Sequence, residues 1–303
     1  MNYWDTARAC SLPIDPMKYG RRKGTRRALA LACGLLLLTG VSVSAADIPM
    51  VRPSLEQGFQ LLYNLDFGRA HEEFISWEQE HPQDPLGPTC DAAGLLFSEF
   101  HRLGVLEGQF YEDDKTFGSR KKLDPDPAVR DRFSATLDHA ENIANVRLAK
   151  DAKDRDALFA MTLASGLRAD YAALVEKRNL ASLHYTKLAN DWAGQLLAVD
   201  PDCYDAHLAT GVNNYIVGSM AAPVRWFLRL GGVAGDKERG IAQLQLTAER
   251  GHFLAPFARI MLAIAFKREK DSARARQMLD SLREEFPGNP LFAREIARID
   301  AGR

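Results

Sequence analysis

Apolar residues recur at helical spacing along nearly the whole chain from residue 50 to residue 302, and this periodicity most constrains the fold. From Ala275 onward they stand at Ala275, Met278, Leu279, Leu282 and Phe286, the spacing that lines one face of an amphipathic helix. No segment alternates apolar and polar residues with enrichment in β-branched residues, so no strand is predicted. We therefore expect an all-α fold.

Pro and Gly lie mainly between the periodic segments and divide them into short helices. The predicted helices span 52–64, 67–80, 88–110, 127–152, 154–177, 179–199, 203–219, 223–230, 237–250, 253–269, 272–285 and 290–300. The polar segment 111–126 is predicted to be a loop. Asp202 and Asp205 resemble the two ends of a capping box at the start of the helix 203–219.

The first 46 residues differ from the rest of the chain in charge and hydropathy. They hold seven Lys or Arg against two Asp, then an apolar run over 28–38, then small residues up to Ala45. This order is typical of a secretory signal peptide, and the apolar run is shorter than the about 20 residues that a spanning helix needs. We predict a signal peptide over 1–46, cleaved near Ala45, with an uncleaved signal anchor as the alternative. Met17 is a more typical signal start than Met1, which makes residues 1–16 a candidate start-site artefact.

The remainder, 47–303, holds 32 basic and 38 acidic residues. That balance gives no support to nucleic-acid binding, which normally needs a basic excess. An export signal places the protein in the bacterial periplasm or cell envelope, or outside the cell. Only Cys90 and Cys203 remain after cleavage, and two separately buried thiols are favoured over one disulfide.

A 34-residue frame relates several parts of the chain. With Val51 at position 1, Gly58 stands at position 8, Ala70 at 20, Phe74 at 24 and Pro82 at 32. Small side chains at 8 and 20 let two helices approach closely, and Pro at 32 blocks continuation of the second helix. The frame recurs near 204–250, where an insertion interrupts it, and over 256–289. In the second copy Gly211 stands at position 8, so we predict that it lies where two helices touch.

These small, bulky and Pro positions resemble the tetratricopeptide-repeat (TPR) family, although the Trp that this family carries at position 4 is absent. The resemblance implies a right-handed superhelix, or solenoid, of antiparallel helix hairpins with insertions. It implies a single TPR-like domain over 47–303 with repeats near 51–84, 204–250 and 256–289 and a C-terminal capping helix over 290–300. A generic α-helical bundle is the alternative.

No motif specifies a reaction. The Gly-rich stretch 231–237 lacks the spacing and the upstream strand of a phosphate-binding loop, and a turn before a helix capped by Asp236 explains it better. The His residues are scattered without zinc-site spacing, and the acidic clusters lack the pattern of a calcium loop. We predict no catalytic residue, no cofactor and no metal, and we do not expect an enzyme.

The resemblance places a partner-binding groove on the first helix of each repeat. The residues of this sequence that it puts there are Phe59, Leu62, Tyr63, Leu208, Val212, Tyr215, Ile264, Lys267 and Arg268. The set is mainly apolar, which suits an amphipathic helix or an apolar peptide. The alternative is that inserted helices fill the groove and these residues are core. The function implied is an exported scaffold that binds another protein or peptide; the alternative is a membrane-associated or lipid-handling helical protein of the cell envelope.

The segment 216–230 is the most apolar stretch after the signal segment. In the helix predicted there, Trp226 and Phe227 lie on an apolar face and Arg225 and Arg229 lie together on another. Trp226 and Phe227 are therefore candidates for an accessory contact with a partner or a membrane surface. We expect this helix to pack internally, with Trp226 buried.

Overall fold

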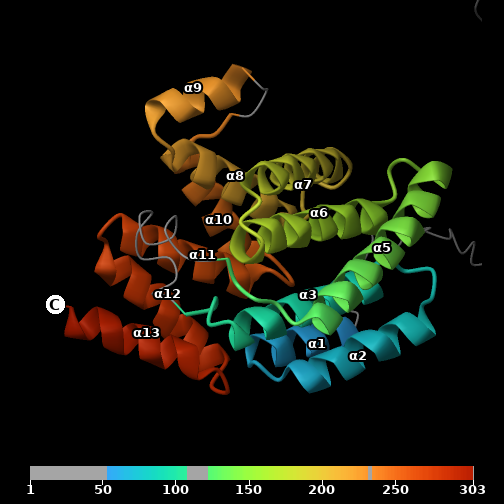
Figure 1. Cartoon of the computed structure of the whole chain (residues 1–303), viewed down its shortest axis with the longest axis horizontal. Coiled ribbons are helices and arrows are strands. Elements are labelled where there is room, and N and C mark those ends of the chain that lie inside the picture. The colour runs from blue at the N-terminus through green and yellow to red at the C-terminus, as the bar shows by residue number, and fades with distance from the viewer. Residues whose placement is uncertain (1–52, 108–121, 231–233, 303) are drawn as a thin grey trace, which may run out of the picture. The chain divides into compact units, whose positions relative to one another are not determined.

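The computed structural model describes residues 53–107, 122–230 and 234–302, all within one compact unit, Val51–Arg303. In these ranges every regular element is helical and no strand occurs, which confirms the all-α prediction (Figure 1). The α-helices are α1 (Pro53–Tyr63), α2 (Phe67–Glu80), α3 (Leu86–Arg102), α5 (Pro127–Lys150), α6 (Arg155–Asp170), α7 (Asn179–Val199), α8 (His207–Ser219), α9 (Ala222–Leu230), α10 (Lys237–Arg250), α11 (Ala255–Arg268), α12 (Ser272–Glu285) and α13 (Pro290–Ala301). The predicted signal peptide and residues 111–121 of the predicted loop lie outside the described residues.

One predicted helix start is wrong. The helix expected from residue 203 begins as a short 3-10 turn, Tyr204–Ala206, before α8, and no capping box forms there. The Asp205 carboxylate is buried and instead accepts hydrogen bonds from the backbone N–H groups of Phe253 and Leu254, both at 3.0 Å. Asp205 thus satisfies backbone donors at the start of α11, 48 residues further along the chain.

Helix α6 continues as a π-helical turn, Tyr171–Val175, and forms a long apolar helix at the centre of the fold. By length and composition, Arg155–Val175 is apolar enough to cross a membrane, and 61% of that stretch is buried inside the protein. It packs on α3, α5 and α7. The core position of this helix therefore accounts for its apolar composition.

Turns of one geometry follow four of the described helices, α2, α5, α7 and α12, whereas the turn after α10 differs. In each of the four, the carbonyl of the C-cap residue accepts a hydrogen bond from the N–H three residues further on, at 2.8 to 3.2 Å. The donor and acceptor pairs are Asp84 to His81, Asp154 to Asp151, Cys203 to Asp200 and Asn289 to Phe286. Within pairs, α1 packs on α2, α3 on α5, α6 on α7, α8 on α10 and α11 on α12; between pairs, α2 packs on α3, α5 on α6, α7 on α8, α10 on α11 and α12 on α13.

The first and last helix pairs also share the turn inside the pair. Leu65 and Lys270, 205 residues apart, both adopt positive φ, at 64° and 63°. The N–H of the next residue, Asp66 or Asp271, then donates to the carbonyl five residues earlier, at 2.9 and 2.8 Å, as in a Schellman motif. Each Asp side chain also caps the second helix of its pair. The same local structure therefore recurs at the predicted repeat positions.

Close helix packing occurs at both glycines that stand at position 8. A Cβ on Gly58 would overlap the ring of Phe74, which is fully buried. A Cβ on Gly211 would lie 3.1 Å from both the backbone N and Cγ of Leu244 on α10. The prediction that Gly211 lies at a helix–helix contact is confirmed.

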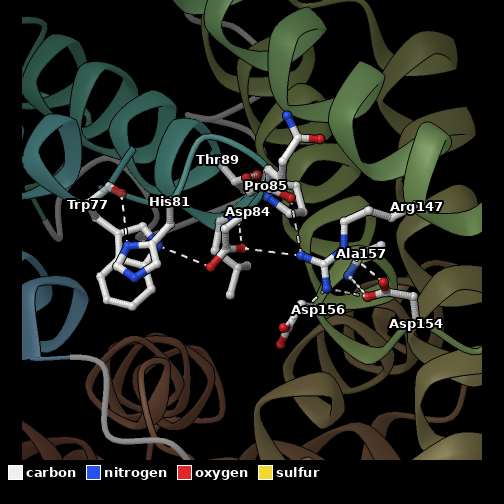
Figure 2. Close-up of polar contacts among 11 residues, drawn as sticks. Trp77, His81, Asp84, Pro85, Thr89, Arg147, Asp154, Asp156 and Ala157 are labelled. Atoms are coloured by element: carbon white, nitrogen blue, oxygen red, sulfur yellow. Dashed lines mark hydrogen bonds and ion pairs between the residues drawn. The ribbon is translucent and has the colours of Figure 1, made fainter. Parts of the chain in front are cut away.

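The polar network of Figure 2 joins two of the repeated turns. Arg147 of α5 donates to both carboxylate oxygens of Asp154, at 2.7 and 2.9 Å, and to the carbonyl oxygen of Gln83 at 3.3 Å. In the other turn, the indole N–H of Trp77 donates to the Asp84 carboxylate at 3.0 Å. Arg147 therefore holds the turn after α2 against the turn after α5, which is a structural role.

Contacts far apart in sequence fix α1 against the C-terminal helices. The Tyr63 hydroxyl donates to the carbonyl of Phe253 at 3.0 Å, and the Asn289 side chain donates to the Tyr63 carbonyl at 2.9 Å. Cys90 and Cys203 are both buried and no disulfide joins them, as predicted.

Candidate functional site

The predicted groove residues of α1 are part of the core. Phe59, Leu62 and Tyr63 are 6%, 5% and 8% exposed. The ring of Phe253 stacks 4.9 Å from that of Phe59, and the ring of Phe286 lies 5.2 Å from that of Tyr63. These three residues are core, as in the alternative, but Phe253 and Phe286 cover them and an inserted helix does not. A partner would reach them only if the C-terminal helices moved away.

The predicted groove residues of α8 remain partly accessible. Leu208, Val212 and Tyr215 are half-buried, and the first two pack on the edge of the core. Burial raises the pKa of the Tyr215 hydroxyl, and the charge of Arg268 opposes that rise, so these two side chains lie near each other. The structure therefore brings the α8 residues close to the C-terminal end of α11.

On α11, Ile264 is half-buried and Arg268 is exposed. Lys267 is half-buried, and its ammonium group lies 3.7 Å from the Glu295 carboxylate of α13. Leu208, Val212, Tyr215 and Ile264 are thus partly exposed, and Arg268 is an exposed cation at the end of α11. We call this set (Leu208, Val212, Tyr215, Ile264 and Arg268) the α8–α11 surface.

The described residues contain no cluster of three or more His, Cys, Asp or Glu side chains able to hold a metal ion. The tightest arrangement resembling catalytic groups is His71 with the buried Asp91. His71 Nδ1 lies 2.5 Å from an Asp91 oxygen, and Arg132 of α5 donates to His71 Nε2 at 2.8 Å. Since both ring nitrogens are engaged, this imidazole joins α2, α3 and α5 and does not present a free base.

Helix α9 does not pack internally, so the expectation of a buried Trp226 is wrong. The Trp226 side chain is 59% exposed and Val224 is 47% exposed. Figure 1 shows α9 beside α8, apart from α1 to α3 and from α11 to α13. The Phe227 side chain lies outside the described part of the structure, so its predicted role as an accessory contact stays a prediction.

The close contact between α8 and α10 explains why α9 is exposed. A Cβ on Gly218, near the end of α8, would overlap the backbone N of Lys237 at the start of α10. A Cβ on Gly240 would overlap the backbone N of Tyr215 and lie 2.8 Å from the carbonyl oxygen of Gly211. Because α8 and α10 are in backbone contact, no room remains between them for an inserted helix.

The Gly-rich segment before α10 serves this packing. Asp236 caps α10 by accepting a hydrogen bond from the Arg239 N–H at 2.8 Å, which confirms the predicted cap. Asn214 of α8 donates to the Gln243 side chain of α10 at 2.8 Å. The glycines and these polar contacts hold α8 against α10, and α9 projects from the end of this pair. The sequence alone did not indicate this backbone contact between α8 and α10.

Comparison of the chain with protein-family models finds no match, and comparison with curated protein sequences finds no significant match. Function is therefore argued from the two exposed features described above. They are the α8–α11 surface and helix α9.

Proposed function

We propose that the chain is an exported, TPR-like solenoid, a right-handed superhelix of helix hairpins, that binds another protein or peptide and performs no chemistry of its own. The recurring turn geometry supports this proposal, as does the packing of helix pairs in chain order. The shared turns of the first and last pairs, 205 residues apart, support a common repeat unit. Such arrays present extended binding surfaces.

The observation that carries the proposal is the partial exposure of the α8–α11 surface. Side chains at the corresponding positions of α1 are buried, whereas Leu208, Val212, Tyr215 and Ile264 keep accessible area. Arg268 adds an exposed cation at one end. This chemistry suits an apolar or amphipathic peptide with an acidic residue near one end.

Site-specific photocrosslinking in the native cell envelope tests the proposal. A photoreactive phenylalanine derivative at Val212 or at Ile264 should capture the same partner. The matched control is Val146 on α5, which is 52% exposed and belongs to neither surface. Capture of one protein from both test positions and not from Val146 is expected, because both positions face one surface. Equal capture from Val146, or none from either test position, would refute a partner site there.

The export half of the proposal rests on the N-terminal 46 residues. Cleavage near Ala45 is expected to remove the apolar run 28–38 from the mature protein. Intact-mass measurement on protein isolated from its host checks this. A mass that still includes residues 28–45 would show an uncleaved anchor.

A further inference from the structure

Helix α9 projects from the protein, and both of its Arg side chains, Arg225 and Arg229, are exposed. The Arg225 guanidinium donates to the carbonyl oxygen of Gly218 on α8 at 2.8 Å. Arg225 and Arg229 also line a pocket of about 640 Å³ between α9, the end of α8 and the start of α10. Among the α9 side chains that the structure describes, the large apolar ones that are exposed are Val224 and Trp226. The helix therefore presents both apolar and cationic side chains to the solvent.

This apolar surface is locally concentrated. Of the six large hydrophobic side chains that are exposed in the described part of the chain, three fall between residues 216 and 226: Ile216 at 47%, Val224 at 47% and Trp226 at 59%. Isolated exposed apolar side chains are common on protein surfaces, but two on one short projecting helix, α9, mark a candidate interaction site.

We propose that α9 docks on the surface of an anionic lipid bilayer. Trp226 enters the headgroup region, where an indole buries its ring and keeps its N–H near polar groups. Arg229 is exposed at the C-terminal end of the helix and lies beside the lipid phosphates. Arg225 holds the orientation of the helix through its bond to Gly218.

Charge complementarity supports a lipid surface. Helix α9 carries two Arg and no acidic residue, although 47–303 as a whole has more acidic than basic residues. An apolar face flanked by basic residues is the pattern of helices that lie in the interface of anionic membranes. The acidic side chains near α9, Asp236, Glu238 and Glu269, lie on the protein side of the helix, around the pocket.

The size of α9 also favours a bilayer over a protein partner. Stable protein–protein interfaces bury roughly 800 Å² on each partner, which is more than one face of a nine-residue helix can supply. A bilayer interface takes up a short apolar face without matching its shape. One such helix gives reversible attachment, which would place the α8–α11 surface close to the membrane.

Vesicle sedimentation tests the proposal with residues 47–303, which contain the complete compact unit and lack the apolar signal segment. The vesicles are phosphatidylcholine alone or phosphatidylcholine mixed with phosphatidylglycerol. The protein should bind the mixed vesicles. Trp226→Ala should lower the partition coefficient by about tenfold, since a buried aromatic side chain is lost. Arg229→Gln should lower it by about fivefold on the mixed vesicles alone.

The matched control is Leu180→Ala, which removes an 85% exposed side chain on α7 and should leave binding unchanged. Absence of binding to the mixed vesicles, or binding that Trp226→Ala leaves unchanged, would overturn the proposal. Self-association without vesicles that Trp226→Ala abolishes would overturn it too, and would assign this face to a second copy of the chain. The α8–α11 surface is intact in all these variants, so vesicle binding and partner capture succeed or fail independently.

Discussion

Replacing Gly240 by Ala is the sharpest test of the close contact between α8 and α10. Gly240 lies inside α10, and a Cβ there would overlap the backbone N of Tyr215 and lie 2.8 Å from the carbonyl oxygen of Gly211. The obstructing atoms belong to the backbone of α8, so no side-chain rotation relieves the overlap. The two helices would have to separate, and the packing of the buried Leu244 would loosen.

Two effects of opposite sign decide the magnitude for Gly240→Ala. Helix propensity alone should stabilise the protein by about 1 kcal/mol, because Ala is the better helix former. Overpacking against a rigid neighbour costs about 3 kcal/mol, at the upper end of its usual range. We therefore expect the free energy of unfolding to fall by about 2 kcal/mol, which for a domain of this size lowers the melting temperature by roughly 4–8 °C.

Gly194→Ala is the matched control. Gly194 lies inside α7, and a Cβ there meets nothing within 4 Å. The same substitution should raise the free energy of unfolding by about 0.5–1 kcal/mol. Thermal and urea unfolding of both variants measure the two changes. A midpoint for Gly240→Ala that is unchanged or raised would refute the backbone contact, and a fall of similar size in both variants would show that the effect is not local.

Two further predictions concern buried charge. Burial raises the pKa of the Asp170 carboxyl to about 7, so the folded state keeps a proton that the unfolded state has already lost, and stability should fall as the pH rises from about 4 to about 7. Asp170→Asn should remove this pH dependence. It should raise the free energy of unfolding by about 1–2 kcal/mol above pH 7 and leave it unchanged below about pH 4. An equal gain at both pH values would contradict the raised pKa of Asp170. For Asp154, burial opposes ionisation, but the hydrogen bonds and charge of Arg147, together with the backbone N–H of Ala157, outweigh it and lower the pKa of the carboxyl. The stability that this ionised carboxylate contributes is therefore present near neutral pH and lost in acid. Arg147→Met should lower the free energy of unfolding by about 2–3 kcal/mol near neutral pH and by less in acid. Arg130→Met breaks only an exposed pair and should leave the midpoint of urea unfolding nearly unchanged.

Local rules in the sequence predict most of the helices. Periodicity and punctuation by Pro and Gly place α2, α7, α10 and α12 at their observed bounds. The helix signals act within a few residues, so they are readable from one sequence. The frame that put Gly58 and Gly211 at helix contacts works for the same reason, because a hairpin is built from neighbours in the chain.

Two of the failures involve distant contacts. The capping box at Asp202 and Asp205 looked complete locally, but the start of α11 supplies better donors for the Asp205 carboxylate. Phe59 stands at a repeat position that the family resemblance assigns to the groove. It is buried because Phe253 packs on it. The spacing of apolar residues within one repeat does not indicate which later segment of the chain will cover its apolar face.

The exposure of α9 has a cause in the glycines at the end of α8 and just before α10. A Cβ on Gly235 would lie 2.8 Å from the backbone N of Gly218, so the chain returns to α10 in direct contact with the end of α8. The stretch between these two points must therefore leave the core, whatever its composition. A polar insertion would meet water there at little cost, whereas this one presents Val224 and Trp226. Exposed apolar area of this kind favours aggregation. Contact with a membrane, as proposed for α9, would cover this area and so offset that cost.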